Sequence, residues 1–219
     1  MVVSSREFMG RSASLLADKE LASVVVRLMM AMNDLGVANS ALSEWEQTED
    51  RKKDVRRDGG KLYYGRMMMA HVYEALHIIE EIKGSAPLRA AVARCDSKTS
   101  ASFKAVEKFL DTDDYKVLCR IRNNSSFHYS PKLTMRALEK LVEKYPNHIS
   151  PYSLGQNTLD WYFELGDLIN DKIVVRDIFK VPDQDDLRTA IDPILLRLHT
   201  MAVAFTDFAG HFIWHCMKK

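Results

Sequence analysis

The sequence is poor in the residues that make turns, cross-links and membrane spans. Its 219 residues include 9 glycines and 6 prolines, too few for a many-turned β-sandwich. The three cysteines, Cys95, Cys119 and Cys216, are an odd number without a close pair. They exclude a Cys-rich zinc module, provide no disulfide framework, and so favour a reducing compartment. The 31 basic and 30 acidic residues give a net charge of +1, which supplies no overall attraction to a polyanion.

The patterns of a membrane span and of a secretion signal are also missing. The most apolar stretch, residues 200–216, contains Asp207, His211 and His215, which a hydrocarbon layer would penalise. The N-terminal segment lacks the apolar core of a signal peptide, and we expect residues 1–17 to form a flexible tail. The sequence therefore predicts a cytoplasmic protein that has no membrane contact.

What the chain does have is apolar content at helical spacing. Its apolar (47%) and charged (28%) fractions are those of a globular protein. Apolar residues recur every third or fourth position, for example at Leu21, Val24, Val25 and Leu28, and make a stripe that can bury one helix face. We therefore predict an all-α fold, in which residues 1–219 form a single domain built as a bundle of five to seven helices.

Capping residues and helix breakers predict where the helices begin and end. Candidate N-caps are Ser85, Thr112 or Asp113, and Ser130. The charged run 49–60, which ends in two glycines, predicts a connection. The predicted helices cover about 18–47, 61–83, a short segment after residue 85, 98–110, 112–128, 131–145, and a last helix that residues 182–186 cap and that runs to the C-terminus.

Two later stretches are less regular. Residues 146–157 are predicted to form a loop. In residues 159–179, the alternation of Trp161, Phe163 and Leu165 is typical of a strand, but the spacing of the apolar residues also fits a helix. We favour the helix and leave the strand open.

The predicted helix that leads to His128 departs from its own binary pattern. With Leu118 at the centre of the apolar face, Arg122 lies about 40° and His128 about 280° around an ideal helix, both on the apolar half. A guanidinium there is costly unless it is paired or faces a wet groove, and such departures are expected at functional or strained sites. The helix end favours an imidazolium, and the start of the next helix can bind a phosphate. This combination suits phosphodiester chemistry without a metal.

These residues resemble the motif of the HEPN superfamily (higher eukaryotes and prokaryotes nucleotide-binding). In that family an Arg, often followed directly by an Asn, precedes a His by four to six intervening residues near a helix end of an all-helical bundle. Arg122, Asn123 and His128 match this pattern with five intervening residues. The resemblance covers a motif-bearing core of about residues 61–145.

The resemblance implies a metal-independent endoribonuclease that needs no cofactor. His128 would act as general acid or base in the attack of an RNA 2′-OH on the adjacent phosphorus. Arg122 would hold the phosphate and stabilise its developing charge, and Asn123 and Tyr129 would be supporting, phosphate-binding residues. One toxin branch of the family has a modifiable Tyr two places after the His. Here that place is taken by Ser130, so this modification is not implied.

The same resemblance implies the partners of the protein. HEPN proteins typically dimerise so that two copies of the motif share one cleft, and many belong to prokaryotic toxin–antitoxin, phage-defence or RNA-processing systems. We therefore expect RNA as substrate and a homodimer as the assembly. An antitoxin or another regulatory protein is a further partner that the resemblance admits.

Two alternatives stay open. In the first, the protein resembles other HEPN members that have lost catalysis and serve as interaction or nucleotide-binding modules. In the second, the motif residues are structural: the Arg is buried and paired with a carboxylate, and the His makes its hydrogen bonds within the fold. The spacing occurs a second time at Arg66 and His71. That pair lies in a methionine-rich run without a polar neighbour, so we interpret it as structural.

Overall fold

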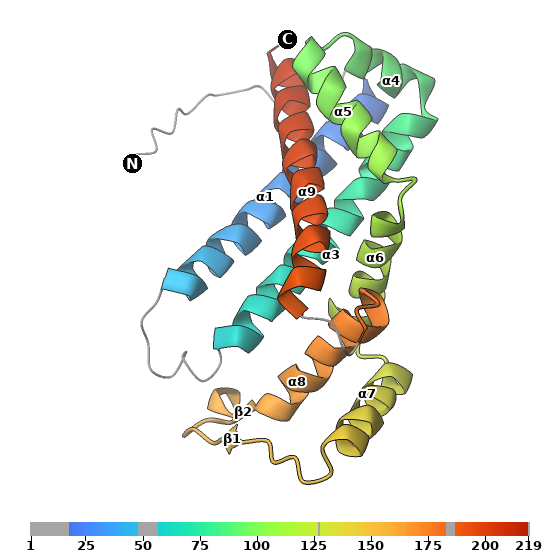
Figure 1. Cartoon of the computed structure of the whole chain (residues 1–219). Helices are drawn as coiled ribbons and strands as arrows, with labels where there is room; N and C mark the ends of the chain where they lie inside the picture. Colours follow the sequence, from blue (N-terminus) through green and yellow to red (C-terminus); the bar gives the residue numbers. More distant parts are fainter. Residues whose placement is uncertain (1–17, 48–56, 127, 183–186, 219) are drawn as a thin grey trace.

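The chain is mostly helical in a computed structural model that describes residues 18–47, 57–126, 128–182 and 187–218 (Figure 1). The all-α prediction is therefore confirmed. The described α-helices are α1 (Lys19–Gln47), α3 (Arg57–Gly84), α4 (Ala86–Ala93), α5 (Ser97–Phe109), α6 (Asp113–Ile121), α7 (Pro131–Lys144), α8 (Glu164–Lys172) and α9 (Leu187–Met217). These eight helices exceed the predicted maximum by one, and the additional helix is α8, which lies in the stretch 159–179 whose structure the sequence leaves open.

The predicted N-caps are confirmed in the part of the chain that the structure describes. The side chain of Ser85 accepts from the backbone N–H of Leu88 at the start of α4. The side chain of Thr112 accepts from the backbone N–H of Tyr115 at the start of α6. Ser130 accepts from the N–H of Leu133 in α7, whose first residue is a proline. Each cap satisfies an N–H group that the helix itself leaves without a partner, so local chemistry alone fixes these three helix starts.

The predicted connection at residues 49–60 is wrong at its C-terminal end. Residues 48–56 lie outside the described part, but α3 begins at Arg57, and Gly59 and Gly60 are helical. A β-carbon at Gly60 would overlap the indole ring of Trp45, and one at Gly59 would overlap the carboxylate of Asp167. The two glycines therefore allow a close approach between elements instead of marking a turn.

The larger hydrophobic cluster of the described residues is built from α1, α3, α4, α5 and α9, together with Leu118 of α6. Phe205, Phe208 and Phe212 of α9 are fully buried in it. The ring centroid of Phe208 lies 5.1 Å from that of Phe103 in α5 and 5.4 Å from that of Phe212. Burial of one such side chain contributes about 1.5–3 kcal/mol, so this aromatic row is a main source of stability.

Among the described helices, α1 is long and apolar enough to cross a membrane by length and composition, over Lys19–Trp45. This is a different segment from residues 200–216, which the sequence pattern singles out. Val24, Val25 and Leu28 of α1 are completely buried in the larger cluster. One face of α1 thus packs as a core helix of a bundle does.

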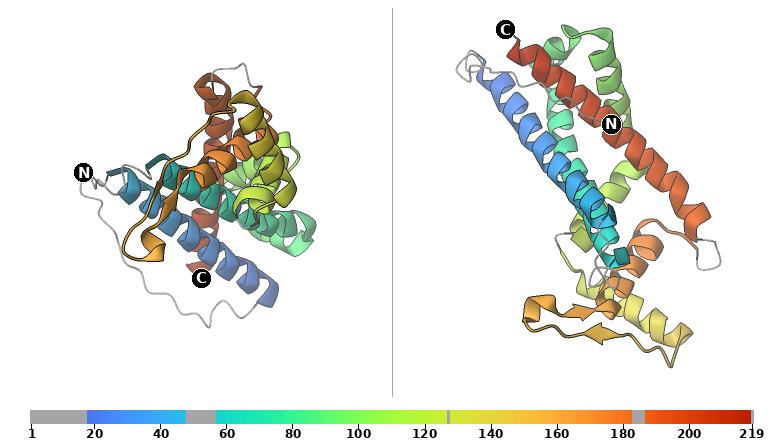
Figure 2. Two further views of the ribbon diagram at one scale, coloured as in Figure 1. Left: turned by 90° about the horizontal axis from the view of Figure 1, so that it is seen from below. Right: turned by 90° about the vertical axis from the view of Figure 1, so that its left-hand side faces the viewer.

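The smaller hydrophobic cluster joins the end of α6 to α7, α8 and a π-helical segment, Ile173–Ile178. The buried carboxylate of Asp177 in this segment is paired with Arg136 of α7, which is the usual condition for a charge inside a protein. Figures 1 and 2 show α7, α8 and a small hairpin together at the end of the molecule opposite the C-terminus.

The stretch 159–179 contains both structures that its pattern allows. Strand β2 (Tyr162–Phe163) pairs antiparallel with β1 (Tyr152–Ser153), and α8 follows directly. The favoured helix prediction is correct from Glu164 onward and wrong for the hairpin. Strand β1 also interrupts the loop predicted over residues 146–157.

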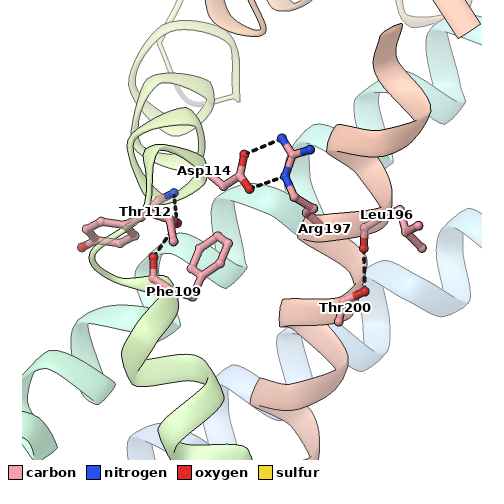
Figure 3. Close-up of polar contacts among 7 residues, drawn as sticks. Phe109, Thr112, Asp114, Leu196, Arg197 and Thr200 are labelled. Atoms are coloured by element: carbon pink, nitrogen blue, oxygen red, sulfur yellow. Dashed lines mark hydrogen bonds and ion pairs between the residues drawn. The ribbon is translucent and has the colours of Figure 1, made fainter. Parts of the chain in front are cut away.

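An ion pair fastens α6 to α9. Arg197 donates from Nε and Nη2 to the carboxylate oxygens of Asp114 at 2.6 and 3.0 Å (Figure 3). Asp114 lies in the first turn of α6, where the helix dipole favours a negative charge, and the hydrogen bond raises the pKa of Arg197. The α6 helix is thereby held in place at the end distant from the motif residues.

Candidate functional site

The helix that carries the motif changes character at Arg122. α6 ends at Ile121, and Arg122–Ser126 form a π-helical segment. Within it, Asn124 donates to the carbonyl of Arg120 at 2.9 Å and Ser125 donates to that of Ile121 at 3.1 Å. Such side-chain bonds compete with the α-helical ladder, and π-helical turns are frequent at functional sites. The wheel that predicts the positions of Arg122 and His128 does not hold beyond Ile121.

Arg122 is partly buried and firmly held. Its side chain is 33% exposed, and its Nε donates to Oε1 of Glu74 in α3 at 2.7 Å. Nη1 donates to Oδ1 of Asn123 at 3.0 Å, and the Asn123 amide donates to Sγ of Cys119 at 3.3 Å. The structure thus shows Asn123 hydrogen-bonded to Arg122, and the phosphate-binding role of both residues stays a prediction. It also supplies a carboxylate, Glu74, that the sequence pattern does not identify.

His128 lies on the surface, which corrects the prediction that it occupies the apolar half of a helix. It follows the end of the π-helical segment in the connection to α7, and both His128 and Tyr129 are exposed. Among the described residues, no hydrogen bond or ion pair joins His128 to Arg122. Ser130 already caps one N–H group of α7, which reduces the predicted phosphate site at that helix start.

A row of hydrogen-bonding side chains continues from Asn123 along the seam between α3 and α6. Two main effects raise the pKa of Tyr73 to about 12: the hydrogen bond to Cys119 is the larger, and burial is the smaller. Burial and the hydrogen bond to Glu80 raise the pKa of Tyr115, whose hydroxyl donates to Oε1 of Glu80 at 2.9 Å. A side-chain hydrogen bond also joins Tyr73 to Tyr115, so Arg122 and Asn123 adjoin a continuous row of hydrogen-bonded side chains.

The second match to the motif spacing splits apart in space. Nδ1 of His71 lies 3.8 Å from Oδ2 of Asp34 in α1, whereas Arg66 is only 6% exposed and faces α8. In the amide orientation that satisfies both groups, Oδ1 of Asn170 accepts from the two Nη groups of Arg66 at 2.9 and 3.0 Å. Nε of Arg66 has no hydrogen-bond partner in the described part of the chain.

Burial lowers the pKa of Arg66, and the nearby carboxylates of Asp171 and Asp167 oppose this effect. The carbonyl of Arg66 also accepts from the hydroxyl of Ser126 at 3.1 Å, so the π-helical segment is tied to α3 at this residue. These bonds agree with the structural interpretation of Arg66, and the residue also lines a pocket. The signal in the sequence is a lone cation next to a methionine-rich run.

The pocket above Arg66 has a volume of about 710 Å³. Elements α3, α7 and α8, the β1–β2 hairpin and the motif segment contribute to its walls. The aromatic side chains that line it are Tyr63, Tyr129, Tyr152 and Phe163. Asn124 and Tyr129, which both lie in the motif segment (residues 122–129), line the pocket. The pocket therefore adjoins the part of the chain that carries His128.

The comparisons with known proteins do not extend this description. No family model, no curated protein and no solved structure matches the chain. The described residues contain no group of three or more His, Cys, Asp or Glu side chains that could hold a metal ion. Fold and site together define an all-α protein with a π-helical polar segment beside an aromatic-lined pocket.

Proposed function

We propose that the protein is a HEPN-like, metal-independent endoribonuclease whose reaction takes place at the motif segment. The observation that carries the proposal is that Arg122 is held in a fixed orientation while part of it stays exposed. Its guanidinium is fixed by Glu74 and Asn123, yet one third of the side chain reaches solvent. A guanidinium oriented in this way is suited to bind a phosphate, because its planar array of donors matches phosphate oxygens.

The chemistry then follows from the neighbouring side chains. His128 is exposed and accessible to a strand of RNA. As a general base it takes the proton of the 2′-OH, the 2′-oxygen attacks the phosphorus, and the bond to the 5′-oxygen breaks. A proton returned to that oxygen gives a 5′-hydroxyl and a 2′,3′-cyclic phosphate. Arg122 stabilises the charge on the phosphate, and Asn123 and Tyr129 support its binding.

The proposal includes the assembly and the setting that the resemblance implies. Two copies of the chain would face each other with their motif segments across one cleft, so that Arg122 and His128 of both copies surround the RNA. The setting would be a prokaryotic toxin–antitoxin or phage-defence system in the cytoplasm, with an antitoxin or regulator as partner.

The test is cleavage of a single-stranded RNA by purified wild type and by His128→Ala and Arg122→Gln. We expect His128→Ala to lose at least about 100-fold in rate, since general acid–base catalysis contributes that much or more. His199→Ala, an exposed histidine of α9, is the matched control and should cleave normally. EDTA should leave the rate unchanged, and the products should carry cyclic phosphate ends. Cleavage that survives His128→Ala, or that EDTA abolishes, contradicts the proposal.

A second candidate is a non-catalytic interaction module with the same fold. It is favoured by the 2.7 Å contact between Arg122 and Glu74, because a guanidinium bound to a carboxylate in its own chain needs no phosphate. An intact fold by circular dichroism, together with no cleavage of any RNA by wild type, would select this candidate.

A further inference from the structure

We propose that the pocket above Arg66 binds a planar heteroaromatic ring of the nucleobase type. Its source is either a free nucleoside or an unstacked base of a single-stranded RNA. The second source rests on the proposed function, whereas the ring chemistry rests on the pocket alone. Three properties of the pocket carry the inference: its aromatic wall, its mixed polar floor and its balanced charge.

The wall provides stacking surfaces. The pocket of about 710 Å³ falls within the size range of small-ligand sites, and four aromatic rings line it. Tyr129 (76% exposed), Tyr152 (68%) and Phe163 (56%) all keep much of their surface open to solvent. Exposed rings that line a pocket can stack on an unstacked base, because every base has a π-face.

The floor provides groups that read the edge of a ring. Asn124 and Asn170 line the pocket, as does Asp167. Each has one bond within the chain: Nδ2 of Asn124 donates to Arg120, Oδ1 of Asn170 accepts from Arg66, and Oδ2 of Asp167 accepts from the hydroxyl of Tyr162. The second oxygen of Asp167 and the other end of each amide are the groups that can read a ring edge. Arg66 lines the pocket as well, and its two Nη groups donate to Oδ1 of Asn170. The buried guanidinium thus fixes the position of the Asn170 amide in the pocket lining.

The charges argue against a simple anion site. The positive charge of Arg66 lies within the field of Asp167 and Asp171, so the floor does not require a negatively charged ligand. A neutral ring with donors and acceptors on its edge fits this balance better than a carboxylate or a phosphate does. Small aromatic carboxylates such as benzoate are therefore expected to bind more weakly than nucleosides.

The position of the pocket connects it to the proposed reaction. Tyr129 follows His128 directly in sequence, and Asn124 belongs to the same π-helical segment as Arg122. A base held in the pocket would therefore position its strand beside His128. This gives the endoribonuclease a preference for single-stranded RNA, whose bases are free to leave the stack.

The experiment titrates the full chain with the four nucleosides, with benzoate, and with a 2′-O-methyl oligoribonucleotide that cannot be cleaved. Tyr152→Ala and Phe163→Ala should each weaken binding about five-fold or more, the usual range for loss of one stacking partner. Leu159→Ala is the matched control, because Leu159 lies between the two hairpin strands, is 91% exposed and does not line the pocket. That variant should bind as wild type does.

The outcomes separate the two proposals. Binding of nucleosides alone assigns the pocket to a free ligand, and binding of the oligonucleotide assigns it to an RNA strand; both support the ring chemistry. If wild type binds a nucleoside or the oligonucleotide but cleaves no RNA, the pocket proposal is supported and the endoribonuclease proposal is contradicted. The pocket proposal is overturned if neither probe binds, if benzoate binds more tightly, or if Tyr152→Ala and Phe163→Ala bind as wild type does.

Discussion

The guanidinium of Arg122 and the carboxylate of Glu74 meet at 2.7 Å across the seam between the π-helical segment and α3. The pair orients Arg122 and also partly neutralises its charge, so under the proposed function Glu74 would weaken the attraction of this surface for a phosphate. Its partial exposure (33% and 47% for the two side chains) means that its effect on stability is small. The role of the pair is therefore better tested by measuring RNA binding than by measuring stability.

Replacement of Glu74 by glutamine should strengthen RNA binding without a large cost in stability. The change keeps the shape of the side chain but removes its charge, and an exposed ion pair contributes about 0.2–1 kcal/mol. We expect affinity for RNA at low salt to rise two- to five-fold. Glu81→Gln is the matched control, since Glu81 lies in α3 as Glu74 does and forms an ion pair of the same length, 2.7 Å, with Arg27 of α1. Equal affinities of the two variants would contradict a local role for Glu74.

Asn170→Ala should destabilise the fold through Arg66. The amide oxygen of Asn170 accepts from both Nη groups of this buried guanidinium, and loss of a partner by a buried polar group costs about 1–3 kcal/mol. Equilibrium urea unfolding measures the change. The exposed Asn39→Ala in α1 provides the comparison and should stay within about 0.5 kcal/mol of wild type. A loss below that limit in Asn170→Ala would show that the amide does not support Arg66.

Two glycines of α3 should respond in opposite directions to alanine. In Gly60→Ala the new methyl group meets the ring of Trp45, and overpacking costs about 1–3 kcal/mol. A methyl group at Gly65 has nothing within 4 Å, so Gly65→Ala should stabilise the helix by about 0.5–1 kcal/mol. Thermal and urea unfolding of both variants checks the signs. Stabilisation in both would show that α1 and α3 are farther apart at this point.

Tyr73 should make stability fall in alkaline solution. Its pKa in the folded chain is raised to about 12 from an ordinary value of 10.0, first by the hydrogen bond to Cys119 and then by burial. Between these two values the unfolded chain loses the proton before the folded chain does, so the free energy of unfolding decreases as pH rises. The free energy of unfolding, measured with urea from pH 8 to 11, should therefore decrease less steeply with pH in Tyr73→Phe than in wild type. Below pH 9 the difference between the two proteins should not depend on pH, and parallel curves over the whole range would contradict the raised pKa.

Local chemistry explains which parts of the fold follow from the sequence. Ser85, Thr112 and Ser130 are recognisable as caps because each interacts with N–H groups only a few residues away. The glycines at 59 and 60 mislead for the opposite reason. Their role depends on Trp45 and Asp167, and contacts that form only in the folded chain leave no local signal.

The candidate site shows the same limit. The polar residues at 122–126 are visible as a break in the apolar pattern, and in the structure Arg122 donates to Asn123. The position of His128 cannot be derived from an ideal wheel, because side-chain bonds to the backbone change the helix after Ile121. The partner of Arg66 is equally invisible, since Asn170 lies on a different helix far along the chain.

The π-helical turn at Arg122–Ser126 has a consequence for the length of the chain at this point. A π-helical turn holds more residues than an α-helical one because its hydrogen bonds reach one residue farther. Removal of one amino acid here would take away this extra residue, and the chain would leave the helix at a point about 100° different around its axis. The connection that carries His128 and Tyr129 would then start in another direction, so a deletion in this segment is expected to displace Tyr129 from the pocket that it lines.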